Sequence, residues 1–195
     1  MSNETKDRFS VQKLALLGMM SALVFASNYL RVTMPIAIGG RTSFTLANIL
    51  CCMSGLVLGP AGGLASGLGS AIYDLTNPLY ASECWITFLT KGAMGLVAGL
   101  TVKKALGEDK LTYPKAVTGA VLGCVTYYIL YFFKSFAYDG LLIDRLTVPV
   151  ALSVLPLKVP ASLFNAAVAI IGAPLLTMAV RTALKRAGLG RLTRA

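Results

Sequence analysis

Residues 56–74 read LVLGPAGGLASGLGSAIYD, an apolar run that contains five glycines and ends on a tyrosine and a carboxylate. In a soluble helix each interior glycine costs about 1 kcal/mol relative to alanine. In a bilayer the same residues are useful, because membrane helices pack through small residues that let two backbones approach closely. Small residues recur at four-residue spacing, at Gly63 and Gly67 and at Ala61, Ala65 and Gly69. The run therefore predicts a membrane helix that packs closely on a neighbour.

The composition of the whole chain supports this prediction. Of 195 residues, 56% are hydrophobic and 13% are charged, and the mean hydropathy is +0.72. These values lie outside the range of soluble domains. We expect an all-α integral membrane protein in which residues 1–195 form a single transmembrane domain. Six spanning helices of about 20 residues would nearly use up the chain, which leaves no room for a soluble catalytic domain.

Six apolar segments predict the helices of this domain. They are approximately residues 14–34, 44–58, 61–75, 85–106, 116–136 and 151–184. The second and third are short for a full crossing, and the Gly59-Pro60 pair between them predicts a turn. The alternative is a five-span protein in which these two segments form one helix.

The distribution of basic residues predicts the orientation in the membrane, because Lys and Arg concentrate in short cytoplasmic loops. The N-terminal segment, the connection after the fourth helix and the C-terminal tail together hold 12 of the 18 basic residues. The opposite side carries fewer basic residues, together with Asp74, Glu83, Asp139 and Asp144. Both termini are therefore expected in the cytoplasm, which requires an even number of spans and favours six over five.

Several classes of chemistry are excluded by the residues that the chain lacks. It has no histidine, which excludes HExxH zinc sites and Ser-His-Asp triads. The four cysteines form no CxxC pair, and no GxxxxGK[ST] phosphate loop follows the glycines. The chain has a net charge of +10, but its basic residues flank apolar segments and form no stripe with interleaved aromatic residues. Nucleic acid is therefore not the expected partner. We expect no catalytic residue, no metal and no cofactor.

Polar and aromatic residues gather where the predicted third to sixth helices reach the outer face. Lys91 lies six residues beyond Trp85, or roughly 9 Å deeper along a helix. An ionisable residue at that depth marks a site or a buried charge pair. The candidate site contains Asp74, Asn77, Glu83, Trp85, Lys91, Tyr127, Tyr131 and Asn165. Together they predict an outward-facing small-molecule pocket.

Each of these residues also has a structural interpretation. In this interpretation Trp85 belongs to the aromatic belt at the membrane interface, and Asp74 and Glu83 are charged residues in solvated loops. Lys91 fits a side chain that extends to the membrane surface, and Asn165 fits a hydrogen bond between helices. The pocket is predicted because all of these residues are expected at a similar depth in the membrane and on the same, outer side. No residue by itself would predict a pocket.

In the order and spacing of its segments, the chain resembles the substrate-binding S components of energy-coupling factor (ECF) vitamin transporters. The likeness covers most of the chain and is strongest over residues 41–100. It rests on Gly18, Ala22 and Ala26 in the first helix, RTSFTLANI before the second, LGPAGGLASGLGSAIYDL in the third, and TFLTKGAMGLVAGL in the fourth. The resemblance implies a six-helix bundle that binds one vitamin-like molecule from outside the cell.

The resemblance also implies partners and contact residues. An S component works with a transmembrane T subunit and two ATP-binding subunits, in a bacterial cell membrane. The family's AxxxA face, which meets the T subunit, matches Ala22 and Ala26, and Gly18 continues the same stripe. The ligand is held by the loop between helices one and two and by helices four to six, which map to Arg41, Lys91, Tyr127, Tyr131 and Asn165.

The resemblance leaves the vitamin open among riboflavin, pyridoxine or hydroxymethylpyrimidine, folate and cobalamin. Two other classes of function stay open beside it. One is a stand-alone secondary transporter or channel, for which internal repeats would be expected. The other is a small integral membrane enzyme of lipid metabolism, such as an acyltransferase, which would require a convergent base and nucleophile.

Overall fold

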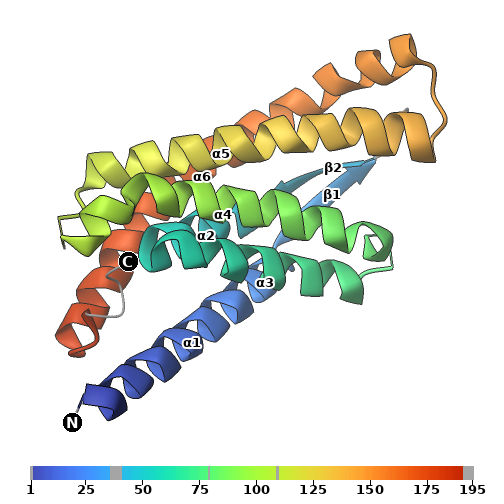
Figure 1. Ribbon diagram of the computed structural model, residues 1–195. Helices are drawn as coiled ribbons and strands as arrows, with labels where there is room; N and C mark the ends of the chain where they lie inside the picture. The colour runs from blue at the N-terminus through green and yellow to red at the C-terminus, as the bar shows by residue number, and fades with distance from the viewer. Residues whose placement is uncertain (1, 36–40, 79, 109, 191–195) are drawn as a thin grey trace.

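The structure, a computed structural model, describes residues 2–35, 41–78, 80–108 and 110–190, with side chains described from Val11 onward except at residues 34, 35 and 41. Within these residues the chain is helical apart from one hairpin (Figure 1). The helices are α1 (Ser2–Ser27), α2 (Ala47–Leu58), α3 (Gly62–Thr76), α4 (Cys84–Gly107), α5 (Tyr113–Lys134) and α6 (Val148–Arg186). The strands are β1 (Arg31–Pro35) and β2 (Arg41–Thr45).

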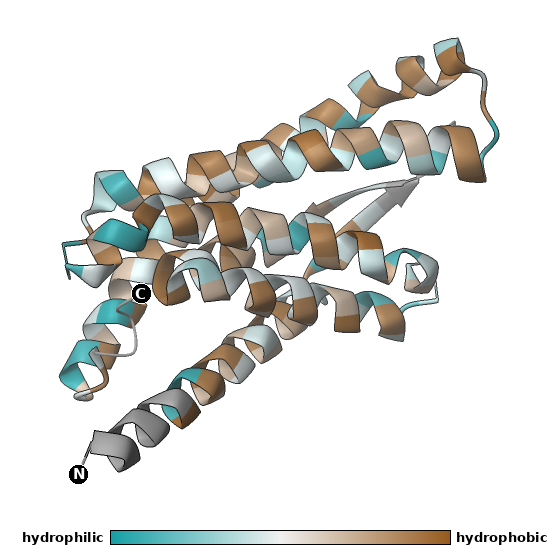
Figure 2. Cartoon of the chain, viewed as in Figure 1, coloured by the Kyte–Doolittle hydropathy of each residue, from teal (hydrophilic) through white to brown (hydrophobic). Residues whose placement is uncertain are grey.

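Four helical segments are long and apolar enough to cross a membrane: Ala47–Thr76, Ala81–Gly107, Tyr113–Ile143 and Val148–Arg186. Val11–Ser27 is a shorter apolar helix. Hydrophobic side chains occur along every one of these helices (Figure 2), including many on the outside of the bundle. An apolar exterior of this kind is what a lipid-facing bundle requires. The protein is thus a helical membrane protein.

The segment Ala47–Thr76 does not run straight. Gly59 has φ +67°, in the left-handed region that favours glycine, and a 3₁₀ turn over Gly59–Ala61 separates α2 from α3. Cys51 Sγ lies 3.7 Å from Ser70 Oγ, although 19 residues separate them in the chain. A continuous helix would place them about 28 Å apart. α2 and α3 therefore fold back on each other at the Gly59-Pro60 turn, where the sequence predicts one.

Glycines fix the packing of α2, α3 and α4. A Cβ added to Gly63 would lie 2.8 Å from the carbonyl oxygen of Gly92, and one at Gly67 would lie 2.9 Å from that of Phe88. At Gly55 and Gly99 an added Cβ would overlap backbone atoms of the neighbouring segment. The close helix packing predicted from residues 56–74 is confirmed.

The predicted first helix is wrong at its C-terminal end. α1 ends at Ser27, and the side-chain amide of Asn28 donates to the carbonyl of Val24 at 2.8 Å. The chain then forms the antiparallel hairpin β1–β2, in which Val32 pairs with Phe44. The hairpin is also an exception to the all-α prediction. It points toward the end of the bundle where α3 stops and α4 starts (Figure 1).

α1 also begins at Ser2, well before the predicted start at residue 14. The ends of the other five helices lie close to the predicted segments, and two details differ. α5 continues after Lys134 into a π-helix over Ser135–Ile143. α6 has 39 residues and contains Pro156, Pro160 and Pro174, each of which removes a backbone donor from the helix. The start of α1, the α4–α5 connection and the end of α6 share one end of the bundle (Figure 1), which is the arrangement that the charge distribution requires. The number of spans and the side of the membrane stay predictions.

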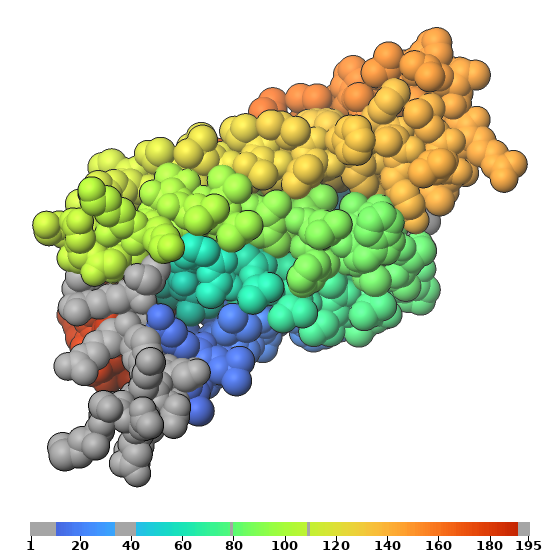
Figure 3. Space-filling view, in the orientation of Figure 1, coloured from blue at the N-terminus to red at the C-terminus, as the bar shows by residue number. Residues whose placement is uncertain are grey.

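α1 lies at the edge of the bundle, next to α3 (Figure 3). Its inner face buries Leu16, Met20 and Val24. Gly69 of α3 sits so close to α1 that an added Cβ would lie 2.8 Å from Cβ of Val24. One face of α1 is therefore packed against α3, and the opposite face is not covered by any other part of the chain that the structure describes.

Candidate functional site

A cavity of about 100 Å³ opens where the hairpin, α3, α4 and α5 meet, at the end of the bundle away from the start of α1. The hairpin contributes Arg31, Ser43 and Thr45, and α3 contributes Asp74. α4 and the segment before it supply most of one wall, and α5 with its π-helical extension supplies the opposite wall. The remaining lining residues are Tyr80, Glu83, Ile86, Thr87, Thr90, Lys91, Tyr127, Tyr131, Lys134 and Asp139.

Lys91 is the buried cation on the α4 wall, and its exposed fraction is only 3%. Its Nζ donates to Oδ1 of Asn48 in α2 and lies 4.1 Å from the centre of the Tyr127 ring. Among the described residues no carboxylate lies within ion-pair distance of this ammonium group. The alternative in which Lys91 extends to the membrane surface is wrong, because the side chain ends inside the bundle.

Tyrosines of α5 form the aromatic wall of the cavity. The rings of Tyr127 and Tyr131 stack with centroids 5.9 Å apart and an interplanar angle of 25°. The hydroxyl of Tyr128 accepts a hydrogen bond of 3.2 Å from the Asn48 amide. The side-chain oxygen of Asn48 also accepts the hydrogen bond from Lys91. The Asn48 amide therefore holds Lys91 and Tyr128 in fixed relative positions. The wall presents a flat surface on which another ring can stack.

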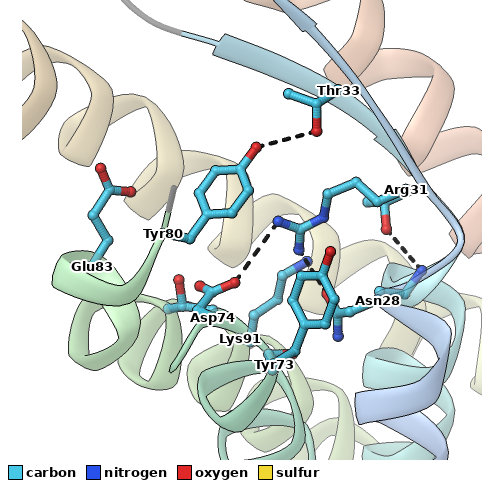
Figure 4. A network of polar contacts seen from close by, with 12 residues as sticks. Asn28, Arg31, Thr33, Tyr73, Asp74, Tyr80, Glu83 and Lys91 are labelled. Atoms are coloured by element: carbon cyan, nitrogen blue, oxygen red, sulfur yellow. Dashed lines mark hydrogen bonds and ion pairs between the residues drawn. The ribbon is translucent and has the colours of Figure 1, made fainter. Parts of the chain in front are cut away.

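Arg31 connects the hairpin to α1 and α3. Its Nη2 donates to Oδ1 of Asn28 at 2.7 Å, and its Nη1 lies 3.8 Å from Oδ1 of Asp74. The guanidinium also lies 5.0 Å from the centre of the Tyr73 ring and 5.1 Å from that of Tyr80. Arg31, Asp74 and Lys91 point toward one another from β1, α3 and α4 (Figure 4). These contacts make Arg31 a central residue of the site.

A second group of charges lies between α4, α5 and α6. Nζ of Lys134 lies 2.6 Å from Glu83 and 2.7 Å from Asp139, and Nζ of Lys158 lies 3.6 Å from Asp139. Lys158 also donates to the hydroxyl of Ser135. A π-helix closes hydrogen bonds between residues five apart, and this spacing brings Lys134 and Asp139 to the same side of the helix. Every charge in this group has a partner of opposite sign.

The structure brings together five of the predicted site residues. Asp74, Glu83, Lys91, Tyr127 and Tyr131 line the cavity. Asp74 and Glu83 form ion pairs and are not solvated loop charges.

The other predicted residues lie elsewhere. Asn165 lines a smaller hollow of about 30 Å³ on the other side of the tyrosines, and its amide group bonds to the backbone of Ser43 and Thr45 in β2. Trp85 is 56% exposed and packs edge-to-face against Tyr138, which fits the interfacial belt. Asn77 is not part of the cavity lining. The side chain of Arg41 lies outside the described residues.

Arg31 and Asn48 belong to the site but are not among the residues predicted from the sequence. The signal for Arg31 is the unusual position of a cation directly after an apolar helix. Asn48 had a comparable signal, because a buried asparagine in a membrane helix needs a hydrogen-bond partner.

The predicted partner stripe lies on the uncovered face of α1. Gly18, Ala22 and Ala26 are exposed, and an added Cβ at Gly18 would meet nothing within 4 Å. The stripe therefore does not pack inside the bundle formed by the described residues. A smooth face of small residues suits close approach of another membrane helix.

Comparison with known proteins assigns the family. Residues 8–182 match the family described as ECF-type riboflavin transporter, S component. The match covers α2 to α5, nearly all of α6, most of α1, the hairpin, the cavity and the α1 stripe. No curated protein gave a significant match to the chain.

Proposed function

Because the chain belongs to the family of ECF-type riboflavin transporter S components, and is thus a subunit of a vitamin transporter and not an enzyme, we propose that its ligand is riboflavin. The observation that carries the proposal is the buried Lys91 set against Tyr127 in the wall of the cavity. A flat heteroaromatic ring can stack on the tyrosines while its carbonyl groups accept from the ammonium group. Glu83, Lys134 and Asp139 at the other side of the cavity offer partners for the hydroxyl groups of a polar side chain.

The cavity must widen to hold such a ligand. Its volume of about 100 Å³ is below the 300 to 1,000 Å³ typical of small-molecule sites. Among the described residues, two polar contacts beside the cavity join β1 to α3 and to the segment before α4: the Arg31 to Asp74 pair and a hydrogen bond of 3.2 Å between the hydroxyls of Thr33 and Tyr80 (Figure 4). Because Asn165 holds β2 against α6, the site would open by separation of β1 from Asp74 and Tyr80.

The wider proposal includes the membrane arrangement and the partners. We propose that the helices form six spans with both termini in the cytoplasm of a bacterial cell, so that the cavity faces outward. The exposed stripe of Gly18, Ala22 and Ala26 would contact a transmembrane T subunit, which in turn binds two ATP-binding subunits. The lack of an ATP-binding loop in this chain fits such a division of labour.

Replacing Lys91 with methionine tests the proposed site. The substitution keeps the length of the side chain and removes the charge, and we expect the affinity for riboflavin to fall at least tenfold, which corresponds to about 1.4 kcal/mol. Quenching of riboflavin fluorescence by the purified protein measures the affinity directly. The matched control is Lys103→Met, an exposed lysine at the far end of the same helix, which should bind normally.

Two results would contradict the proposal. Unchanged affinity of the Lys91→Met protein would reduce Lys91 to a structural residue. Failure of the unmodified protein to bind riboflavin, with binding of pyridoxine, hydroxymethylpyrimidine, folate or cobalamin in its place, would keep the transporter assignment and replace the ligand. Native mass spectrometry of the purified protein would identify such a retained vitamin.

A further inference from the structure

Two buried polar atoms at one side of the cavity lack hydrogen-bond partners among the described residues. One is Nε of Arg31, a donor, and the other is Oδ1 of Asp74, an acceptor. Their side chains are only 10% and 3% exposed, and Nη1 of Arg31 lies 3.8 Å from Asp74 Oδ1. Buried polar groups are nearly always satisfied in folded proteins, and each exception requires an explanation. Since both side chains line the cavity, a ligand that both donates and accepts would satisfy them.

Lys91 adds a second donor to the same side of the cavity. It is close enough to Asp74 for their charges to interact, and its side chain points toward Arg31 and Asp74 (Figure 4). The group therefore consists of two cations and one carboxylate, and it presents two sets of donors beside one acceptor. Its net charge of about +1 is not balanced by any other carboxylate within ion-pair distance among the described residues.

We propose that Arg31, Asp74 and Lys91 recognise a cyclic imide, the edge of a heterocycle in which an N–H lies between two carbonyl groups. This inference rests on the proposed function, because riboflavin carries such an imide at one end of its ring system. Asp74 accepts from the imide N–H, and Arg31 and Lys91 donate to the flanking carbonyl oxygens. Hydrogen bonds of this type to charged groups are stronger than those between neutral groups.

The chemistry of the two sides of the cavity orients the ligand. The opposite end of the flavin ring carries only methyl groups and ring carbons. Placing that end against Arg31, Asp74 and Lys91 would leave Nε of Arg31 and Oδ1 of Asp74 buried without hydrogen-bond partners, which is unfavourable. The charges of Glu83, Asp139, Lys134 and Lys158 already balance one another, and these groups can exchange hydrogen bonds with the hydroxylated chain. The imide therefore binds between β1, α3 and α4, and the hydroxylated chain extends toward α5.

The test compares riboflavin with its N3-methyl analogue, in which the imide N–H is replaced by N–CH₃. For the unmodified protein, we expect methylation to weaken binding at least tenfold in a fluorescence titration. In Asp74→Ala, riboflavin itself should bind at least tenfold more weakly, and the effect of methylation should fall below threefold. In Glu83→Gln, which lies outside the proposed imide site, the full effect of methylation should remain.

The possible results separate the inference from the proposed function. Equal affinity of the unmodified protein for both compounds would overturn imide recognition while riboflavin binding stands. A full methylation effect in Asp74→Ala would likewise show that Asp74 does not face the imide. Should Asp74→Ala fail to fold, Asp74→Asn keeps the shape of the side chain, and the methylation effect should still shrink. If the unmodified protein binds neither compound, the proposed function fails, and the inference fails with it.

Discussion

Small residues at four-residue spacing occur in both α1 and α3, and the bundle uses them in opposite ways. In α3, Gly63 and Gly67 are covered by the backbone of α4. A Cβ atom added to either glycine would lie 2.8 or 2.9 Å from a carbonyl oxygen of α4. In α1, Gly18 has free space around it, and Ala22 and Ala26 are exposed. The same sequence pattern thus produces a packed interface in one helix and an open face in the other.

The difference arises from what the rest of each helix can bury. α1 has larger apolar side chains, Leu16, Met20 and Val24, on the face that packs into the bundle, so its small residues are left outside. α3 has small residues toward both neighbours, because Gly69 contacts α1 while Gly63 and Gly67 contact α4. A small-residue stripe therefore predicts close approach of a helix, and the large residues around it determine whether that helix belongs to the same chain.

The largest effect is expected from a packed glycine. In Gly99→Ala the new methyl group would overlap the backbone of Gly59 and Pro60, which cannot move aside as a side chain can. We expect a loss of about 3 kcal/mol in stability, enough to prevent accumulation of folded protein or to lower its melting temperature sharply in detergent. Normal stability of this variant would show that α2, α3 and α4 pack less closely than described here.

An intermediate effect, limited to transport, is expected from the open face. Ala22→Leu should abolish riboflavin uptake and weaken copurification of the ATP-binding subunits, because leucine would prevent close approach of the T subunit. Riboflavin binding by the isolated protein should be unchanged, since the cavity lies on other elements. Uptake by whole cells and fluorescence titration measure the two properties separately.

The control for this variant is Met19→Leu, a large exposed residue on the same helix, which should transport normally. Joint loss of folding and binding in Ala22→Leu would mean that the stripe packs within the chain. Normal transport would contradict the proposed T-subunit face.

The smallest effect is expected at Gly18. An alanine there meets no atom within 4 Å, so it should leave transport intact and change stability by no more than about 1 kcal/mol, in the favourable direction. Comparison of its melting temperature with that of Gly99→Ala measures the contrast between the open and the packed glycines. A clear destabilisation at Gly18 would show that another part of the chain covers it.

The helices could be predicted because bilayers allow few backbone arrangements. Lipid leaves no water to satisfy exposed peptide groups, so long apolar segments must be helical, and α4 and α6 end close to their predicted limits. The hairpin was missed because Val32 and Met34 extend the apolar run of α1. Its signal was the concentration of β-branched and aromatic residues in RVT and TSFT, which favours strands over helix.

The site could be predicted only in part. Lys91 and Asp74 were identifiable because ionisable residues in apolar helices require a partner or a function. Arg31 and Asn48 were missed because their roles depend on partners in other helices, which spacing along the chain does not reveal. Asn165 lies beside Tyr127 and Tyr131 but outside the cavity, and its amide bonds to the hairpin, so it holds β2 against α6.

The Gly59-Pro60 turn also affects how the protein enters the membrane during synthesis. α2 has 12 residues and α3 has 15, and each is shorter than the approximately 20 residues that a segment needs to insert and span by itself. We therefore expect α2 and α3 to enter the lipid together, as one hairpin. Because Gly55, Gly63 and Gly67 have their closest contacts with α4, that hairpin reaches its final packing only after α4 has been synthesised.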